Sequence, residues 1–132
     1  MNTKNHNNEI ALRGEKYIFE KLKELGLNPE WVAFGNRSSL ADIIVNNKKI
    51  DVKISSIVNY CSYLKGSYRF NFHHHGKKQE GIDYFICICL DDDLIYVFPS
   101  HLIRKKTMMI TPRMIKRGRY AYFLDNWDLL KK

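Results

Sequence analysis

Apolar residues recur with a helical period near the start of the chain, and charged residues fill the positions between them. The apolar positions of this stripe are Ala11, Ile18, Leu22 and Leu25. Gly26 has the conformational freedom that the end of a helix often requires, and Pro29 prevents the helix from continuing. The pattern therefore predicts an amphipathic helix over about residues 8–25.

Beyond this helix, apolar residues alternate with polar ones or form short runs, which is typical of strands. The expected strands cover residues 31–34, 41–45, 48–55, 68–72, 84–90 and 94–99. We expect loops at 35–39 and 73–78, and a tail that combines a short helix at 101–106 with an edge strand at 120–124. Short turns after residues 45 and 90 predict two hairpins.

The length and composition fit one domain over residues 1–132. The chain is 45% hydrophobic and 27% charged, which supplies one modest core. We expect a cytoplasmic protein, because no apolar run reaches a membrane span and the first residues lack the apolar segment of a signal peptide. Cys87 and Cys89 lie in an apolar strand segment and the chain has three cysteines, so buried free thiols are expected.

The chain is strongly basic. Its 22 Lys and Arg residues outnumber 14 Asp and Glu residues, which gives a formal net charge of +8. Residues 60–79 and 101–120 contain several basic residues and no acidic one. A nucleic-acid partner is one explanation of this excess, and a basic surface that only keeps the protein soluble is another. Net charge alone does not decide between them.

The candidate chemistry lies in the first hairpin. If Asn46 and Asn47 form a two-residue turn, antiparallel pairing sets Asp42 opposite Asp51. If the turn slides by one residue, Asp42 faces Lys53 instead. In both registers Asp42, Asp51 and Lys53 share one face of the sheet, because alternate residues of a strand point the same way.

Two carboxylates placed across a hairpin repel each other, and a bound cation removes that conflict. Oxygen ligands suit Mg²⁺ or Mn²⁺, either of which can orient and activate a water molecule. Lys53 is then placed to stabilise charge on a phosphate or to help deprotonate the water. The alternative is a solvent-facing strand with an ordinary Lys–Asp pair, which contributes little to stability.

Glu15 is a third candidate acid. It lies on or beside the apolar stripe of the first helix, where a charged side chain is costly unless a partner satisfies it. A helix packed across the sheet would bring Glu15 to the same metal, as a ligand or as an acid that holds a metal-bound water. The alternative is a boundary residue that forms a surface ion pair.

These residues, taken in order, resemble a known family. Gly14-Glu15 on a helix, Asp42 at the start of a hairpin and Asp51-Val52-Lys53 on its second strand are similar to the PD-(D/E)XK nuclease superfamily, which includes restriction endonucleases and archaeal Holliday-junction resolvases. The resemblance covers about residues 10–100, and residues 101–132 form a basic extension. Ala41 replaces the proline of the motif, and Asp51 stands where Glu is usual.

The resemblance implies an α/β fold, a restriction-endonuclease-like domain with a mixed central sheet of about four or five strands flanked by helices. It also implies that Asp42 and Asp51 are metal ligands, that Lys53 is catalytic, and that Glu15 is a ligand or an orienting acid. Gln79 loosely matches the polar residue that many members place near the metal or phosphate, although it is equally compatible with a loop amide.

Basic residues outside the motif are candidate phosphate contacts. They are Arg37, Arg69, Lys77, Lys78, Arg113, Lys116 and Arg117. The consecutive histidines 73–75 do not indicate zinc, because neighbouring residues cannot all face one ion and no zinc-binding spacing accompanies them.

The sequence thus predicts a Mg²⁺-dependent nuclease that cleaves duplex or branched DNA and uses neither a membrane nor a small-molecule cofactor. We expect a homodimer, since one small domain has one active site, and the apolar segments 84–90 and 120–130 are the expected interface. A catalytically inactive nucleic-acid-binding domain of the same fold and an unrelated basic binding module are the alternatives. The complete acid and lysine set favours the enzyme.

Overall fold

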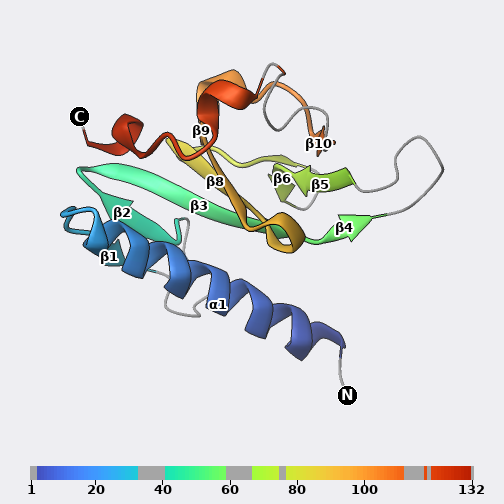
Figure 1. Cartoon of the computed structure of the whole chain (residues 1–132), viewed down its shortest axis with the longest axis horizontal. Helices are drawn as coiled ribbons and strands as arrows, with labels where there is room; N and C mark the ends of the chain where they lie inside the picture. Colours follow the sequence, from blue (N-terminus) through green and yellow to red (C-terminus); the bar gives the residue numbers. More distant parts are fainter. Residues whose placement is uncertain are drawn as a thin grey trace.

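The computed structural model describes residues 3–32, 41–58, 67–74, 77–111, 118 and 120–131, without the side chains of residues 3–8, 57–58, 74 and 77–78. Figure 1 shows the arrangement, in which a long helix crosses one face of the main sheet and a smaller sheet lies on the other side. No helix in the described part of the chain is long and apolar enough to cross a membrane.

Helix α1 (Thr3–Glu24) is the amphipathic helix that the apolar stripe predicts. Ile18 and Leu22 are fully buried between the helix and the sheet, Phe19 packs beside them, and Glu20 is exposed. Gly26 follows with a φ of 84°, the left-handed conformation expected at a helix end. The helix begins before residue 8, where the polar residues carry no apolar period that the sequence pattern would detect.

The main sheet is mixed and has the strand order β1-β2-β3-β8-β9. Its strands are β1 (Glu30–Trp31), β2 (Ile43–Val45), β3 (Lys48–Ser55), β8 (Tyr84–Cys89) and β9 (Leu94–Pro99). Only β3 and β8 pair in parallel, and the other neighbours are antiparallel. The expected α/β domain with a mixed sheet of about four or five strands is confirmed, as are both hairpins.

The β2–β3 hairpin turns through two residues. Asn46 and Asn47 have φ values of 50° and 63°, which suit a tight turn whose twist matches the flanking strands. Val45 pairs with Lys48 and Ile43 pairs with Ile50. This is the first of the two registers that the sequence allows; the pairing ends at Ile43, and the backbone N–H of Asp42 donates to the Ile50 carbonyl at 2.9 Å.

A smaller sheet covers the face opposite α1. It consists of β10 (Thr107–Ile110), β5 (Ser67–Asn71) and β4 (Ile57–Val58), in that order. Strand β5 confirms the prediction for residues 68–72, whereas β10 was not predicted. The expected loop at 73–78 is wrong, because β6 (His73–His74) pairs with β7 (Lys77–Lys78) as a short hairpin.

The apolar run in β8 is explained by burial on both faces of the sheet. Ile86 and Ile88 pack toward α1, whereas Phe85, Cys87 and Cys89 pack toward the smaller sheet. Cys87 and Cys89 are buried free thiols, as expected. This strand lies between β3 and β9 within the domain, so the dimer interface expected at residues 84–90 is wrong.

The C-terminal segment also departs from the expected structure. A 3₁₀-helix (Ser100–Leu102) replaces the helix expected at 101–106, and a 3₁₀-helix (Ala121–Phe123) replaces the strand expected at 120–124. Leu124 still forms one isolated bridge with Tyr96. Trp127 and Leu130 are buried in the core beneath α1, so these apolar residues stabilise the domain itself rather than an interface.

Gly14 of α1 lies directly against Ile54 of β3. A Cβ at this position would lie 2.0 Å from Cδ1 and 2.7 Å from Cγ1 of Ile54 on β3. Such distances are far shorter than any normal contact, so a side chain here would displace the Ile54 side chain or the helix itself. The absence of a side chain at residue 14 therefore sets how closely Glu15 approaches the sheet.

We predict that Gly14→Ala destabilises the protein by about 1–3 kcal/mol through overpacking, although alanine is the better helix former. Chemical denaturation measures the change. Ile54→Val removes Cδ1, so the double variant should lose less stability than the sum of the two single changes. Additive effects would show that the contact with Ile54 is not what excludes a side chain at residue 14.

Candidate active site

Asp42 is held by two backbone groups of β3. It occupies a bend directly before β2, where its backbone N–H donates to the Ile50 carbonyl at 2.9 Å. Its side-chain Oδ2 accepts a hydrogen bond of 2.8 Å from the backbone N–H of Val52. These two contacts with β3 fix the position of Asp42, and its carboxyl group also interacts with the side chain of Asp51.

The environment of Asp42 disfavours its negative charge. Burial and the negative charges of Asp51 and Glu15 together raise the pKa of Asp42 to about 7, although the hydrogen bond from the Val52 N–H lowers it in part. The three acids therefore act on one another, although α1 and the two strands are distant in sequence. A cation beside Asp42 would relieve this repulsion.

Asp51 and Lys53 project from β3 on the side of the sheet opposite α1. They pair with Phe85 and Cys87 of β8, while Ile50 and Ile54 face the helix. Lys53 Nζ lies 3.1 Å from Asp51 Oδ2. The predicted placement of these two residues on one face is correct.

Gln79 holds the amino group of Lys53 from the other side. Its Oε1 accepts a hydrogen bond of 2.6 Å from Lys53 Nζ, which also lies 5.8 Å from the centre of the Phe85 ring. The ammonium group is thus placed between a carboxylate, an amide oxygen and an aromatic ring. Such a cation is fixed in position, unlike an ordinary exposed lysine.

Asp51 Oδ2 is a buried atom without a hydrogen bond among the described residues. Lys53 Nζ lies 3.1 Å from this oxygen and forms an ion pair with it, but the angle between the two groups does not meet the geometry of a hydrogen bond. Buried carboxylate oxygens are normally satisfied, so this atom has capacity for a ligand.

Glu15 approaches from the helix side. It is 9% exposed, and its Oε1 accepts a hydrogen bond of 3.2 Å from Trp31 Nε1. The Trp31 ring packs in turn against Phe19, with ring centres 5.6 Å apart. Glu15 is thus almost completely buried on the apolar side of α1, and its negative charge contributes to the raised pKa of Asp42.

The described residues contain no group of three or more His, Cys, Asp or Glu side chains arranged to hold a metal ion. Two carboxylates, those of Asp42 and Asp51, are nevertheless a sufficient protein contribution for Mg²⁺, which usually keeps several waters and takes the rest of its ligands from substrate phosphates. The unsatisfied Asp51 oxygen and the raised Asp42 pKa both fit such an ion.

The candidate phosphate contacts are less fully described. Arg69 is exposed on β5, and Lys77 and Lys78 form β7, although their side chains lie outside the described set. The other candidates, Arg37, Arg113, Lys116 and Arg117, lie outside the described residues.

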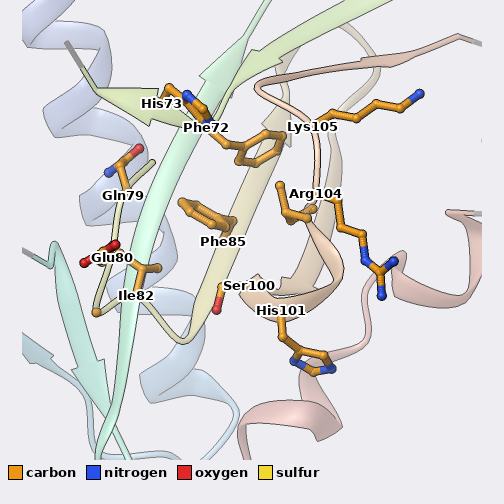
Figure 2. A pocket seen from close by; sticks show the side chains of 12 residues that line it. Phe72, His73, Gln79, Glu80, Ile82, Phe85, Ser100, His101, Arg104 and Lys105 are labelled. Carbon is orange, nitrogen blue, oxygen red and sulfur yellow. The ribbon is translucent and has the colours of Figure 1, made fainter. Parts of the chain in front are cut away.

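Several residues near the site were not predicted individually. Trp31 holds Glu15, and Phe85 lies beside Lys53. Gln79 and Phe85 also line a pocket of about 330 Å³ that includes Arg104 and Lys105 (Figure 2). The basic segment 101–120 was the only sequence signal for the two cations, and it did not indicate where they lie.

Comparison with known proteins supports the fold. No family model matches the chain, and no curated protein matches it. Among solved structures, the bacterial homing endonuclease I-Ssp6803I is similar with a TM-score of 0.65 and 19% sequence identity, over 88% of this chain and 84% of that one. The chain shares its fold with this endonuclease.

We predict that Asp42→Asn stabilises the metal-free protein at pH 8 but has little effect at pH 4. The raised folded-state pKa means that stability is lost as pH rises from the unfolded value near 3.8 through about 7, and Asn removes that loss while it retains an oxygen acceptor for Val52. Thermal melting in chelator at several pH values measures the difference.

Added Mg²⁺ should reverse the order at pH 8, because an ion that binds only the folded protein stabilises the parent more than the variant. If the difference in melting temperature between parent and variant in chelator is the same at every pH, ionisation of Asp42 does not destabilise the folded protein.

Proposed function

We propose that the protein is a divalent-metal-dependent nuclease that hydrolyses DNA phosphodiester bonds. The observation that carries this proposal is the meeting of Asp42 and Asp51 beside a fixed Lys53 ammonium. Two neighbouring carboxylates repel each other and destabilise the fold. A cation bound between them, together with a phosphate substrate, would offset this repulsion. The shared fold with a homing endonuclease is consistent with this activity.

Asp42 and Asp51 would hold Mg²⁺ or Mn²⁺, and Glu15 would keep Asp42 oriented from the helix side. When bound, such an ion polarises the phosphate and lowers the pKa of a coordinated water. Lys53 Nζ would donate to a phosphate oxygen as negative charge develops on it. Gln79 would keep the lysine pointed toward that oxygen.

We further propose membership of the PD-(D/E)XK superfamily. The support is the order of Glu15 on α1, Asp42 before β2, and Asp51 and Lys53 two residues apart on β3. The hairpin register and the burial of Glu15 agree with that order.

DNA is the proposed substrate, and the net charge of +8 supports a polyanionic partner. An endonuclease that cuts both strands of a duplex or branched molecule would act as a homodimer, because each domain has one candidate site. The cytoplasm is the proposed compartment.

The alternative is a catalytically inactive nucleic-acid-binding domain of the same fold. The specific observation in its favour is that no complete three-residue metal group is assembled among the described residues. Metal-dependent cleavage by the purified protein separates the two candidates.

Asp51→Asn should abolish cleavage of labelled DNA in Mg²⁺ or Mn²⁺, since it removes one charged ligand. DNA affinity measured in chelator should stay equal or rise, because the change removes negative charge near the phosphate. Asp128→Asn is the matched control, as Asp128 is an exposed acid paired with Lys131 at 3.1 Å. Parent-like cleavage by Asp51→Asn would exclude Asp51 as a ligand.

Lys53→Ala should lower the single-turnover cleavage rate by roughly 10² to 10³, the effect typical of losing a donor to the transition state. Lys131→Ala removes an exposed lysine and should leave the rate unchanged. Lys53→Arg keeps the charge but changes its shape, so full activity in that variant would show that position 53 supplies charge alone. Full activity in Lys53→Ala would remove the residue from the mechanism.

A further inference from the structure

Two stretches of the chain, residues 60–79 and 101–120, contain basic residues and no acidic one. Strands β8 and β9 separate them in the sequence, yet the fold brings their described parts together, because β5 from the first stretch pairs with β10 from the second. The contact extends one residue beyond β10, where the backbone N–H of Phe72 donates to the Lys106 carbonyl at 2.8 Å. Two acid-free segments therefore lie side by side in the small sheet.

These two strands have one buried face and one open face. Alternate residues point into the core that the small sheet shares with β8 and β9, and the residues between them point away from it. The pairing of β5 with β10 sets the residues of the open face next to one another, and two exposed lysines directly precede β10. We call this open face with the two lysines the basic surface; its residues are Arg69, Asn71, Lys105, Lys106, Thr107 and Met109.

The charge of the basic surface is not neutralised by acids. In the described part of the chain, no ion pair includes Arg69, Lys105 or Lys106, and no acidic side chain of the sequence lies outside that part. Asp92 reaches β5 only on its buried face, where the carboxylate accepts a hydrogen bond from the Tyr68 hydroxyl. A surface of this kind attracts a polyanion.

The opposite side of the molecule has a different charge pattern. Exposed residues of α1 carry both signs, and they are Glu9, Arg13, Lys16, Glu20, Lys23 and Glu24. Basic residues alone therefore do not distinguish the two sides of the protein, whereas the absence of acids does.

The basic surface adjoins the candidate active site. Ser55 lies two residues after Lys53 on β3, on the same face and about 7 Å further along the strand. Its Oγ accepts a hydrogen bond of 3.2 Å from the backbone N–H of Arg69. Figure 1 shows β4 following the end of β3 with β5 beside it. A strand of DNA with a phosphate at Lys53 could therefore continue onto β5.

We propose that the basic surface binds the phosphate backbone of the DNA substrate and leads it to Lys53. Arg69, Lys105 and Lys106 would donate to phosphate oxygens, contacts that position a backbone without reading its base sequence. The inference rests on the proposed nuclease function with DNA as its substrate. It adds the side of the molecule on which the DNA lies.

The experiment measures the affinity for a labelled DNA duplex in chelator at several salt concentrations. Arg69→Ala, Lys105→Ala and the double variant each remove exposed cations of the basic surface. Arg13→Ala and Lys16→Ala are the matched controls, because they remove the same side chains from exposed positions of α1.

Asn71→Asp tests the same surface without the removal of a cation. The Asn71 Oδ1 atom accepts a hydrogen bond of 3.0 Å from the backbone N–H of His73, and an aspartate keeps an oxygen in that place while it adds a negative charge. This variant should fold like the parent and bind DNA more weakly.

We expect Arg69→Ala and Lys105→Ala each to reduce the slope of log affinity against log salt concentration by about one unit, and the double variant by about two, since each lost phosphate contact releases about one counterion fewer. Affinity should fall by a similar factor for duplexes of unrelated sequence. Both α1 variants should keep the slope of the parent. Equal losses in the α1 variants would show that only the net charge matters, and would overturn the inference.

Cleavage of the same duplex in Mg²⁺ is measured in parallel with the parent. If the parent cleaves DNA and every variant of the basic surface binds with the parent's slope, the inference is wrong and the nuclease proposal stands. If the parent does not cleave but the slope falls only in the variants of the basic surface, the nuclease proposal is refuted and the DNA-binding surface is confirmed. A parent that does not bind DNA at all would overturn the inference.

Discussion

The two-residue turn at Asn46 and Asn47 is the constraint on which the candidate site depends. Because both asparagines adopt positive φ, β2 and β3 pair in the register that brings the carboxylates of Asp42 and Asp51 close together. A turn longer by one residue would rotate the two acids to different faces of the sheet. Asn46 also donates to the Leu130 carbonyl at 2.8 Å, so the C-terminal segment is bound to the turn itself.

This register brings carboxylates together in a way that destabilises the metal-free protein. Burial and the charges of Asp51 and Glu15 raise the pKa of Asp42, and Asp51 Oδ2 is buried without a hydrogen bond in the described structure. A fold selected for stability alone would replace these carboxylates by apolar or neutral groups. The proposed divalent ion and phosphate substrate would offset this repulsion, and the fixed Lys53 ammonium would add a positive charge beside them.

The parallel pairing of β3 with β8 connects this chemistry to the pocket that Gln79 and Phe85 line. It sets Asp51 against Phe85, so the ring lies on the same face as Lys53. Gln79, in the segment that leads into β8, then reaches the lysine. One strand therefore contributes to the core, to the surroundings of the lysine and to the pocket floor.

The sequence by itself determined the amphipathic helix, both hairpins and the order of the acids and lysine, because these follow from periodicity and turn chemistry over a few residues. It allowed two registers for Asp42, and only the formed turn chose between them. Trp31 as the partner of Glu15, Gln79 as the partner of Lys53 and the position of Arg104 were decided by tertiary structure. These contacts join residues far apart in the chain, and a local pattern carries no information about which distant residue will fill a given space.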